Sequence, residues 1–320
     1  MLIVLTPALA LMFPYADMLT APKQQLRDSL LISRSVVSMS RGAVKEPGLL
    51  VKTVQAARKK RRDVDAAPLT YNNLIPPGVE RTITFTGCGG LYTYLFGVAS
   101  YVQQNFDVAD STVFASASAG AYPAFLLAAG IDVESFHRKE NKAFLAAVEE
   151  ERKSRSRDSR VAPLGIWNGV LEREWRSALL GRLDAAQIEH MLVNKHYISL
   201  TAMPTLENRL VGEFSSLDDL VSGFIASGFL PIYDSERRLA TEWRGERFFD
   251  GGLSDNAPVP FQGVPSLVLS PSKWRAHTEL ERVPVPFVRS DWAWNDAKFK
   301  LGQEDAREHH EELRAFFLQR

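Results

Sequence analysis

The chain has 320 residues, of which 45% are hydrophobic and 24% are charged, an ordinary composition for a globular protein. Its 38 Lys and Arg residues balance its 38 Asp and Glu residues, so the net positive charge of a dedicated nucleic-acid-binding protein is missing and no nucleic-acid partner is expected. A single cysteine, Cys88, excludes an internal disulfide and a cysteine-based zinc site within one chain.

Residues 1–75 have the composition of a leader. Residues 23–62 contain eleven Lys or Arg against two acidic residues, with serines interspersed, which is typical of a transit peptide or a basic disordered segment. An apolar run, LIVLTPALALMF, precedes them without the positive residues that usually open a signal peptide. The sequence therefore leaves open an organelle-targeting leader and an exposed terminus with a basic linker. We expect the folded part to begin near Pro76.

Strands and helices alternate after the leader. The β-branched run RTITFTG (81–87) predicts a buried strand, and apolar residues at helical spacing predict a helix over 90–106. STVFAS (111–116) predicts a second buried strand, and 119–130 a helix of small residues. This order predicts a right-handed crossover and a parallel sheet.

The rest of the chain continues with both kinds of element. Ser216 precedes a helical pattern and has the residue type of an N-cap. The charged end of the helix predicted over 141–160 indicates an exposed loop rather than a binding patch. Further helices are predicted over 141–160, 171–180, 185–192 and 216–227, and further strands over 196–204, 208–214, 246–252 and 265–271.

Ser118 lies between a predicted strand and a predicted helix, in FASASAG (114–120). A serine hydroxyl becomes a nucleophile when a base accepts its proton and nearby donors stabilise the oxyanion that follows. A strand-to-helix turn exposes the hydroxyl, and the small neighbours Ala117 and Ala119 fit a crowded turn. Small residues also form packing seams, so this segment alone leaves both interpretations open.

A glycine-rich segment, TGCGG (86–90), ends the first predicted strand. Glycines there allow successive N–H groups to form a concave nest for an anion, either a phosphate or a tetrahedral oxyanion. The spacing does not fit the dinucleotide or P-loop motifs, because the third glycine of the former and the Gly-Lys-Ser/Thr of the latter are missing. A tight turn without a ligand is the alternative.

Asp250 ends a predicted strand in FFDGGLSDNAP (248–258). Gly251 and Gly252 leave its carboxylate unshielded by neighbouring side chains, so Asp250 is a candidate general base. Asp-Gly turns are common in proteins, and an ordinary turn is the alternative interpretation.

In order and character these segments resemble the patatin-like phospholipase family, and most closely its triglyceride-lipase and adiponutrin branch. The resemblance covers about residues 80–272. Five motifs in the same order along the chain carry the resemblance and make a chance match improbable. They are GCGG with FGVAS (96–100), SASAGA (116–121), YISLT (197–201), SGFLPIY (227–233) and DGGLSDNAP (250–258).

The resemblance implies a three-layer α/β/α fold with a mostly parallel central sheet. Together with the composition, it divides the chain into the leader 1–75, a catalytic domain 76–275 and an aromatic, charged, helical tail 276–320. It implies a serine carboxylic-ester hydrolase, a lipase or phospholipase A, that forms an acyl-enzyme without a metal or cofactor. Ser118 would be the nucleophile and Asp250 the base. The implied oxyanion hole is Gly87, Cys88, Gly89 and Gly90, and the implied supporting residues are Ser116, Gly120, Gly251 and Gly252.

The implied substrate is an ester of a phospholipid or an acylglycerol at a membrane or lipid-droplet surface, with a protein co-regulator as a further conceivable partner. The implied location is peripheral to a membrane or lipid droplet. Phe287, Trp292, Trp294 and Phe299 in the tail are suited either to attachment at such a surface or to packing over the core.

Two positions depart from the family pattern. The first glycine of GxSxG is Ser116, whose side chain could displace the nucleophile, and a later glycine of the loop is Tyr92. The alternative function is therefore a catalytically impaired lipid-binding or regulatory protein. A Ser-Asp-His triad is a second alternative, for which His277 is the histidine that follows Asp250 at a suitable distance in the chain.

Overall fold

The computed structural model describes residues 75–108, 111–155, 166–234, 236, 238–275 and 289–319. The chain divides into two compact units, Met1–Asn72 and Asn73–Arg320, and all described residues belong to the second. The predicted leader, apart from its last residue, lies outside the described residues, as do His277 and Phe287.

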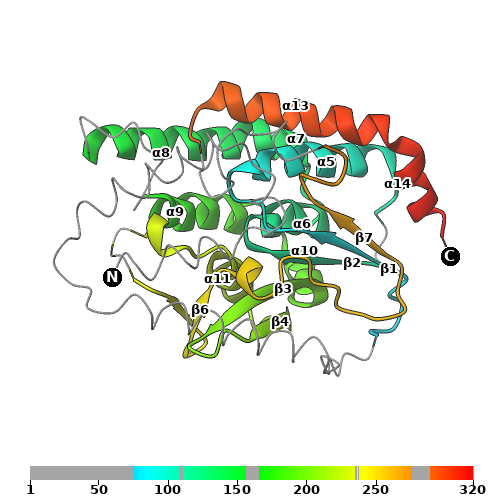
Figure 1. The fold of residues 1–320 in the computed structure, drawn as a ribbon, viewed down its shortest axis with the longest axis horizontal. Helices are drawn as coiled ribbons and strands as arrows, with labels where there is room; N and C mark the ends of the chain where they lie inside the picture. The colour runs from blue at the N-terminus through cyan, green and yellow to red at the C-terminus, as the bar shows by residue number, and fades with distance from the viewer. Residues whose placement is uncertain are drawn as a thin grey trace, which may run out of the picture. The chain divides into compact units, whose positions relative to one another are not determined.

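A seven-stranded sheet forms the centre of this second unit (Figure 1). Its strands are β1 (Arg81–Phe85), β2 (Thr112–Ala117), β3 (Val193–Met203), β4 (Asn208–Glu213), β5 (Thr241–Trp243), β6 (Glu246–Phe249) and β7 (Ser266–Leu269). The order is β5-β6-β3-β2-β1-β7, and β4 also pairs with β3. Strands β7, β1, β2 and β3 are parallel, whereas β4 and β6 run antiparallel to β3.

Helices flank the sheet, which confirms the predicted mixed α/β fold with a mostly parallel central sheet. Helices α6 (Ala121–Ala128), α10 (Ala185–Leu192) and α11 (Leu217–Ser227) lie against strands, and α13 (Trp292–Glu308) lies over α5 (Tyr92–Asn105) (Figure 1). The N-cap predicted at Ser216 is confirmed, since its hydroxyl accepts a hydrogen bond from the Asp219 N–H at 3.1 Å. The α-helices are α5 (Tyr92–Asn105), α6 (Ala121–Ala128), α7 (Val133–Phe136), α8 (Lys142–Arg155), α9 (Trp167–Leu180), α10 (Ala185–Leu192), α11 (Leu217–Ser227), α13 (Trp292–Glu308) and α14 (His310–Phe317), and the short helical turns are η2 (Gly89–Leu91), η3 (Ser118–Gly120), η4 (His137–Asn141), η5 (Pro231–Tyr233) and η6 (Gly251–Leu253).

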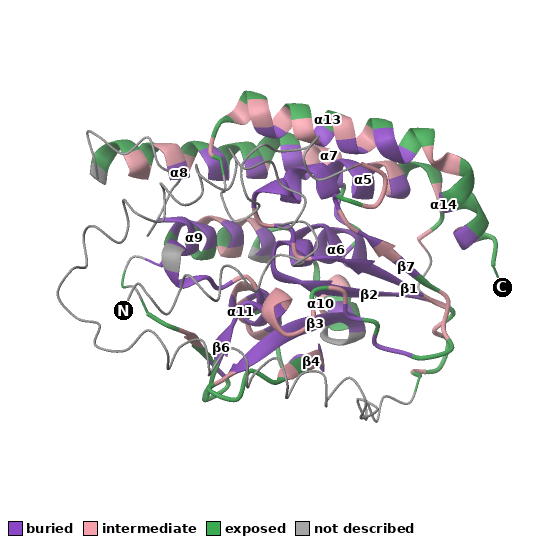
Figure 2. Ribbon diagram, in the orientation of Figure 1, coloured by how far each residue is buried: buried purple, intermediate pink, exposed green. Residues whose placement is uncertain are grey.

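The central strands are buried on both faces, as is usual for parallel strands (Figure 2). On one face, Val113, Ala115 and Tyr197 pack against Phe261, which comes from the segment that leads into β7. Residues of β1 and β2 are thus buried whether they are apolar or polar, Thr82 and Thr84 included, which confirms the two predicted buried strands.

Strands β2 and β6 lie along the same edge of β3. Ser199 of β3 pairs with β2 on one side and with β4 on the other. Two residues further on, Thr201 pairs with β6 and with β4. Because a strand has only two edges, β2 and β6 must share the edge opposite β4. They run in opposite directions, so their carboxyl ends approach each other beside Leu200.

Helix α13 packs closely on α5 through a glycine from each helix. A Cβ atom at Gly97 would lie closer than 3.0 Å to the Phe299 carbonyl, and one at Gly302 would lie equally close to the Tyr94 carbonyl. The Phe299 side chain has no exposed surface, and Trp292 stacks on the His137 ring at 4.8 Å. These two aromatic residues of the tail therefore pack over the core.

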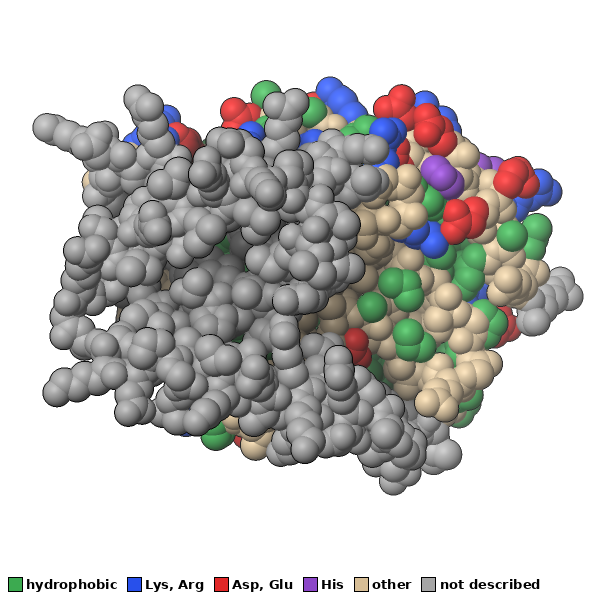
Figure 3. Space-filling model, in the orientation of Figure 1, with side chains coloured by type: hydrophobic (Ala, Val, Ile, Leu, Met, Phe, Trp, Pro, Cys, Tyr) green, Lys and Arg blue, Asp and Glu red, His purple; other side chains and the backbone are tan. Residues whose placement is uncertain are grey.

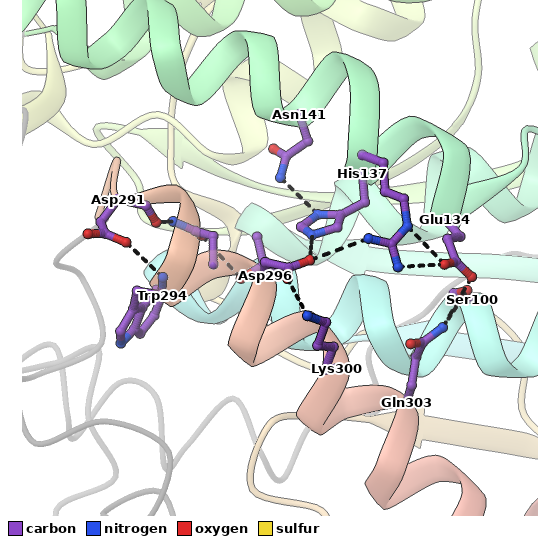
Figure 4. Close-up of polar contacts among 12 residues, drawn as sticks. Ser100, Glu134, His137, Asn141, Asp291, Trp294, Asp296, Lys300 and Gln303 are labelled. Atoms are coloured by element: carbon purple, nitrogen blue, oxygen red, sulfur yellow. Dashed lines mark hydrogen bonds and ion pairs between the residues drawn. The ribbon is translucent and has the colours of Figure 1, made fainter.

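Polar contacts add to this attachment, as Figure 4 shows. The Asp296 carboxylate of α13 forms a salt bridge with Lys300 Nζ at 2.7 Å. Its other oxygen, Oδ1, lies 3.7 Å from both His137 Nε2 and Arg138 Nη1. Asn141 contacts the other ring nitrogen of His137 at 3.1 Å. Burial lowers the pKa of His137 to about 4, so the ring is neutral at physiological pH and contributes mainly packing.

We expect Gly302→Ala to destabilise the protein by about 2 kcal/mol, because its methyl group meets backbone that cannot rotate away. The matched control is Gly169→Ala on α9, where a Cβ atom has nothing within 4 Å. Since alanine is the better helix former, the control is expected to raise stability by about 0.5–1 kcal/mol. Urea unfolding followed by circular dichroism measures both. Destabilisation of equal size in both variants would contradict the close packing.

The outer surface of α13 and α14 carries acidic and basic side chains side by side (Figure 3). In the part of the chain that the structure describes, no helix has both the length and the apolar character needed to cross a bilayer.

Candidate active site

Ser118 lies on a tight turn between β2 and α6. It has a φ of 51°, in the left-handed region that side chains other than glycine rarely adopt. Its N–H donates to Ser227 Oγ at 2.9 Å, and that hydroxyl donates to the Ser199 carbonyl at 2.7 Å. A Cβ atom at Gly120 would lie closer than 3.0 Å to the Phe85 carbonyl. The turn is therefore held against both β1 and β3.

Asp250 lies at the carboxyl end of β6 and meets Ser118 there. Ser118 Oγ donates a hydrogen bond to Asp250 Oδ2 at 2.5 Å, and the Gly252 N–H donates to Oδ1 at 2.8 Å. The Asp250 backbone is also held, since its N–H donates to the Phe229 carbonyl at 3.1 Å and its carbonyl accepts from Thr201 Oγ1 at 2.7 Å. Both carboxylate oxygens thus have a donor.

Close approach of the backbone to β3 explains why a glycine, Gly251, follows Asp250. A Cβ atom at this position would lie closer than 3.0 Å to the Ser199 carbonyl of β3. The chain can therefore turn away from the sheet directly after Asp250, which leaves the carboxylate beside the hydroxyl.

Burial sets the charge state of Asp250. The carboxyl group has no exposed surface, and this desolvation raises its pKa to about 7, although the hydrogen bonds from Ser118 and Gly252 partly oppose the shift. Ionised and neutral forms are then both populated near neutral pH. A base whose pKa lies close to the working pH is well suited to accept and return a proton.

The glycine-rich loop lies directly beside the serine. A Cβ atom at Gly87 would lie 2.9 Å from Ser118 Cβ, and Gly89 has a φ of 50° at the start of η2. Cys88 between them is buried, and this raises the pKa of its thiol, so the group stays neutral. The structure thus brings the three predicted segments, 86–90, 114–120 and 248–258, into one place at the carboxyl edge of the sheet.

Ser116 has a partner that the sequence did not indicate. Its hydroxyl hydrogen-bonds with His196 Nε2 of β3 at 2.7 Å, and neither side chain has exposed surface. Burial lowers the pKa of His196 to about 3, so its ring is neutral. Ser116 keeps its place in the ladders with both neighbouring strands, and the hydrogen bond between Ser118 and Asp250 forms two residues further on.

We expect Ser116→Gly to lower the free energy of unfolding by about 2–3 kcal/mol. The change leaves His196 Nε2 buried without its partner, and glycine weakens a strand. The matched comparison is the same substitution in a His196→Leu background, where no ring nitrogen is left unpaired. Denaturant unfolding of the four proteins gives the coupling. An equal cost in both backgrounds would contradict a stabilising Ser116–His196 hydrogen bond.

Among the described residues, no histidine extends the Ser118–Asp250 pair to a catalytic triad. None of the described histidines hydrogen-bonds to Ser118 or Asp250. His277, the candidate for a triad, lies outside the described residues, so that alternative stays untested.

Three aromatic residues pack together close to the pair. Tyr92, where the family pattern has a glycine, is buried, and its hydroxyl donates to Asn141 Oδ1 at 2.9 Å. Its ring lies 5.6 Å from Tyr122 and 6.0 Å from Trp167. Nearby Asp250 contributes to raising the pKa of Tyr122, after burial, which is the main cause. The dyad therefore borders a mainly apolar region.

The fold and the site together define an α/β protein with a serine–aspartate pair at the carboxyl edge of its sheet. Residues 83–261, more than half of the chain, match the family model described as patatin-like phospholipase. The chain belongs to the patatin-like phospholipase family.

Comparisons with individual proteins give the same family. Human "Patatin-like phospholipase domain-containing protein 2" is 35% identical over 179 residues, which are 55% of this chain and 33% of that protein. Human "1-acylglycerol-3-phosphate O-acyltransferase PNPLA3" is 30% identical over 181 residues, 55% of this chain and 34% of that protein. This chain thus spans about a third of the length of both relatives.

Among solved structures, the ExoU–SpcU complex of Pseudomonas aeruginosa matches with a TM-score of 0.38 at 17% identity. The match covers 74% of this chain and 52% of the solved chain.

Proposed function

We propose that this protein is a lipid acyl hydrolase that cleaves carboxylic esters of phospholipids or acylglycerols through Ser118 and Asp250. The observation that carries the proposal is the 2.5 Å hydrogen bond from Ser118 Oγ to Asp250 Oδ2 in a buried site. A hydroxyl on a strained turn beside a carboxylate of pKa about 7 has both its base and its orientation in place.

The first half of the reaction forms an acyl-enzyme. Ser118 Oγ attacks the ester carbonyl while Asp250 accepts the hydroxyl proton, and the carbonyl oxygen becomes an oxyanion. Backbone N–H groups of residues 87–90 stabilise this oxyanion, as does the N-terminus of η3 and α6. Collapse of the intermediate breaks the ester C–O bond, and the proton on Asp250 passes to the departing alcohol.

The second half releases the acyl group. Water attacks the acyl-enzyme as Asp250 again accepts a proton, which then returns to Ser118 Oγ, and a fatty acid leaves. An alcohol in place of water would give acyl transfer, the reaction in the name of the second relative above. We propose hydrolysis as the main reaction.

The surroundings of the pair support a lipid substrate. Tyr92, Tyr122 and Trp167 pack together near the pair, and we propose that this aromatic cluster favours an acyl chain over a polar substrate. The names of the relatives refer to phospholipase and acylglycerol chemistry. We propose that the ester is taken from a membrane or lipid-droplet surface.

The alternative, a catalytically impaired lipid-binding or regulatory protein, was motivated by Ser116. The hydrogen bond between Ser116 and His196 accommodates the extra hydroxyl within the strand, and Ser118 remains hydrogen-bonded to Asp250. These contacts favour the enzyme over the impaired protein.

Covalent labelling tests the proposal. A fluorophosphonate is expected to label the wild-type protein at Ser118, with hydrolysis of a p-nitrophenyl ester lost in proportion to labelling. Ser118→Ala should be neither labelled nor active. Ser154→Ala, which removes an exposed hydroxyl on α8, is the matched control and should behave as wild type. Turnover that does not depend on Ser118, or a wild type with no turnover, would rule out the proposed function.

A further inference from the structure

Asn256 joins the two loops that carry the proposed chemistry. It lies six positions after Asp250, and its Nδ2 donates a hydrogen bond to the Gly87 carbonyl at 3.2 Å. The two residues are 169 positions apart in the chain. Asn256 is exposed, so this contact is not a by-product of core packing.

Two glycines make room for this side chain. Asn256 Oδ1 lies closer than 3.0 Å to the Cβ position of Gly87 and 2.6 Å from the Cβ position of Gly252. Neither glycine has a positive φ. Space for the Asn256 amide, rather than backbone conformation, is therefore a reason for glycine at both positions.

The hydrogen bond fixes more than a carbonyl. The Gly87 carbonyl and the Cys88 N–H belong to one planar trans peptide, so they point in opposite directions. When Asn256 holds the carbonyl on one side, the N–H is directed to the other. Gly87 also lies against Ser118 Cβ, so this peptide borders the nucleophile.

The same side chain also contacts the loop of the base. Gly252, on which the Asn256 amide rests, donates its N–H to Asp250 Oδ1 at 2.8 Å. Asn256 therefore lies against both the glycine-rich loop and the loop that orients the carboxylate.

We infer that Asn256 is a positioning residue for ester hydrolysis: its amide aligns the Gly87–Cys88 peptide so that the Cys88 N–H stabilises the oxyanion formed at Ser118. The inference rests on the proposed function. It assigns Asn256 no contact with the substrate, and it predicts an effect that is larger in the transition state than in the bound ground state.

Asn256→Ala and Asn256→Asp test this role. Asp keeps the size of Asn but turns an oxygen toward the Gly87 carbonyl, so both variants lose the donor. We expect kcat to fall about 10- to 100-fold for either, with KM within about 3-fold, because an oxyanion donor acts in the transition state. Asn105→Ala and Asn105→Asp are the matched controls, since Asn105 donates to the Tyr101 carbonyl at 2.9 Å on the exposed end of α5.

A thionoester substrate separates oxyanion alignment from a general structural effect. Sulfur is a weak acceptor, so an aligned N–H favours the oxygen ester. The ratio of oxygen-ester to thionoester kcat/KM is expected to fall about as much as kcat in the Asn256 variants and to stay at the wild-type value in the controls. Because Asn256 is exposed, the Tm of each variant should change by no more than about 4 °C.

These outcomes distinguish a failure of the positioning role of Asn256 from a failure of the proposed function. Asn256 variants with wild-type kcat, or with a lower kcat but an unchanged ester ratio, would overturn the positioning role and leave the proposed function intact. A wild type without Ser118-dependent turnover would overturn the proposed function itself. Loss of kcat together with the lower ratio supports both.

Discussion

Asp250→Asn is expected to lower kcat/KM for ester hydrolysis about 1,000-fold while making the folded protein more stable at pH 8. The amide keeps the shape of the carboxylate: its oxygen can accept from the Gly252 N–H while its NH2 donates to Ser118 Oγ, but it cannot take the proton. It also removes a buried charge. Ionising a group whose pKa rises from 3.8 to about 7 on folding costs about 4 kcal/mol of stability.

The pH dependence follows from the sign of the shift. Because the pKa of Asp250 is raised by folding, its neutral form contributes stability that is fully present below pH 3.8 and is lost as the pH rises to about 7. Activity should change in the opposite direction, because the ionised form is the base. Wild-type kcat/KM is expected to rise with a midpoint near pH 7.

Comparison of wild type with Asp250→Asn at each pH isolates this group, since the other titratable groups are shared. The difference in the free energy of unfolding should be near zero at pH 4, grow to pH 7 and stay constant above it. Urea unfolding and initial rates provide both curves. A variant that keeps a tenth of wild-type activity, or a stability difference independent of pH, would refute this role for Asp250.

Gly120→Ala is expected to lower kcat/KM about 100-fold and the free energy of unfolding by about 2–3 kcal/mol. The new methyl group would meet the carbonyls of Phe85 and Thr86, and backbone of a central strand cannot move aside. The turn must shift instead, and a shift of about 1 Å at the nucleophile costs about 100-fold in rate.

Gly169→Ala, the same chemical change in open space, serves again as the control and should leave kcat/KM unchanged. If Gly120→Ala retains wild-type kcat/KM at a reduced stability, the turn is less tightly coupled to β1 than the structure indicates.

Local patterns were sufficient to predict most of the fold. The β-branched run that became β1 and the short apolar run that became β2 each indicated a buried strand, and Ser216 indicated the start of α11. Ser118 and Asp250 became candidates because each stands at the end of a predicted strand with a glycine one or two residues further on, and the resemblance to the family then assigned their roles.

The partners of these residues could not be predicted in the same way. Ser227, Thr201 and Asn256 lie in segments that carry the family resemblance, but no local pattern shows what they bond to, because their contacts depend on which strands are neighbours. His196 is 80 positions from Ser116, and only the parallel pairing of β2 with β3 brings them together. Strand β5, at the edge of the sheet, was not predicted, because its three residues are too few to show the alternation of a strand.

The end-to-end approach of β2 and β6 sets a limit on how this chain can change. Only Leu200 separates Ser199, the last partner of β2, from Thr201, the last partner of β6. One inserted residue there would lengthen β3 by about 3.3 Å, more than the whole span of the hydrogen bond between hydroxyl and carboxylate. Loops elsewhere can grow or shrink during evolution, but a single codon gained at this point would separate the Ser118 hydroxyl from the Asp250 carboxylate.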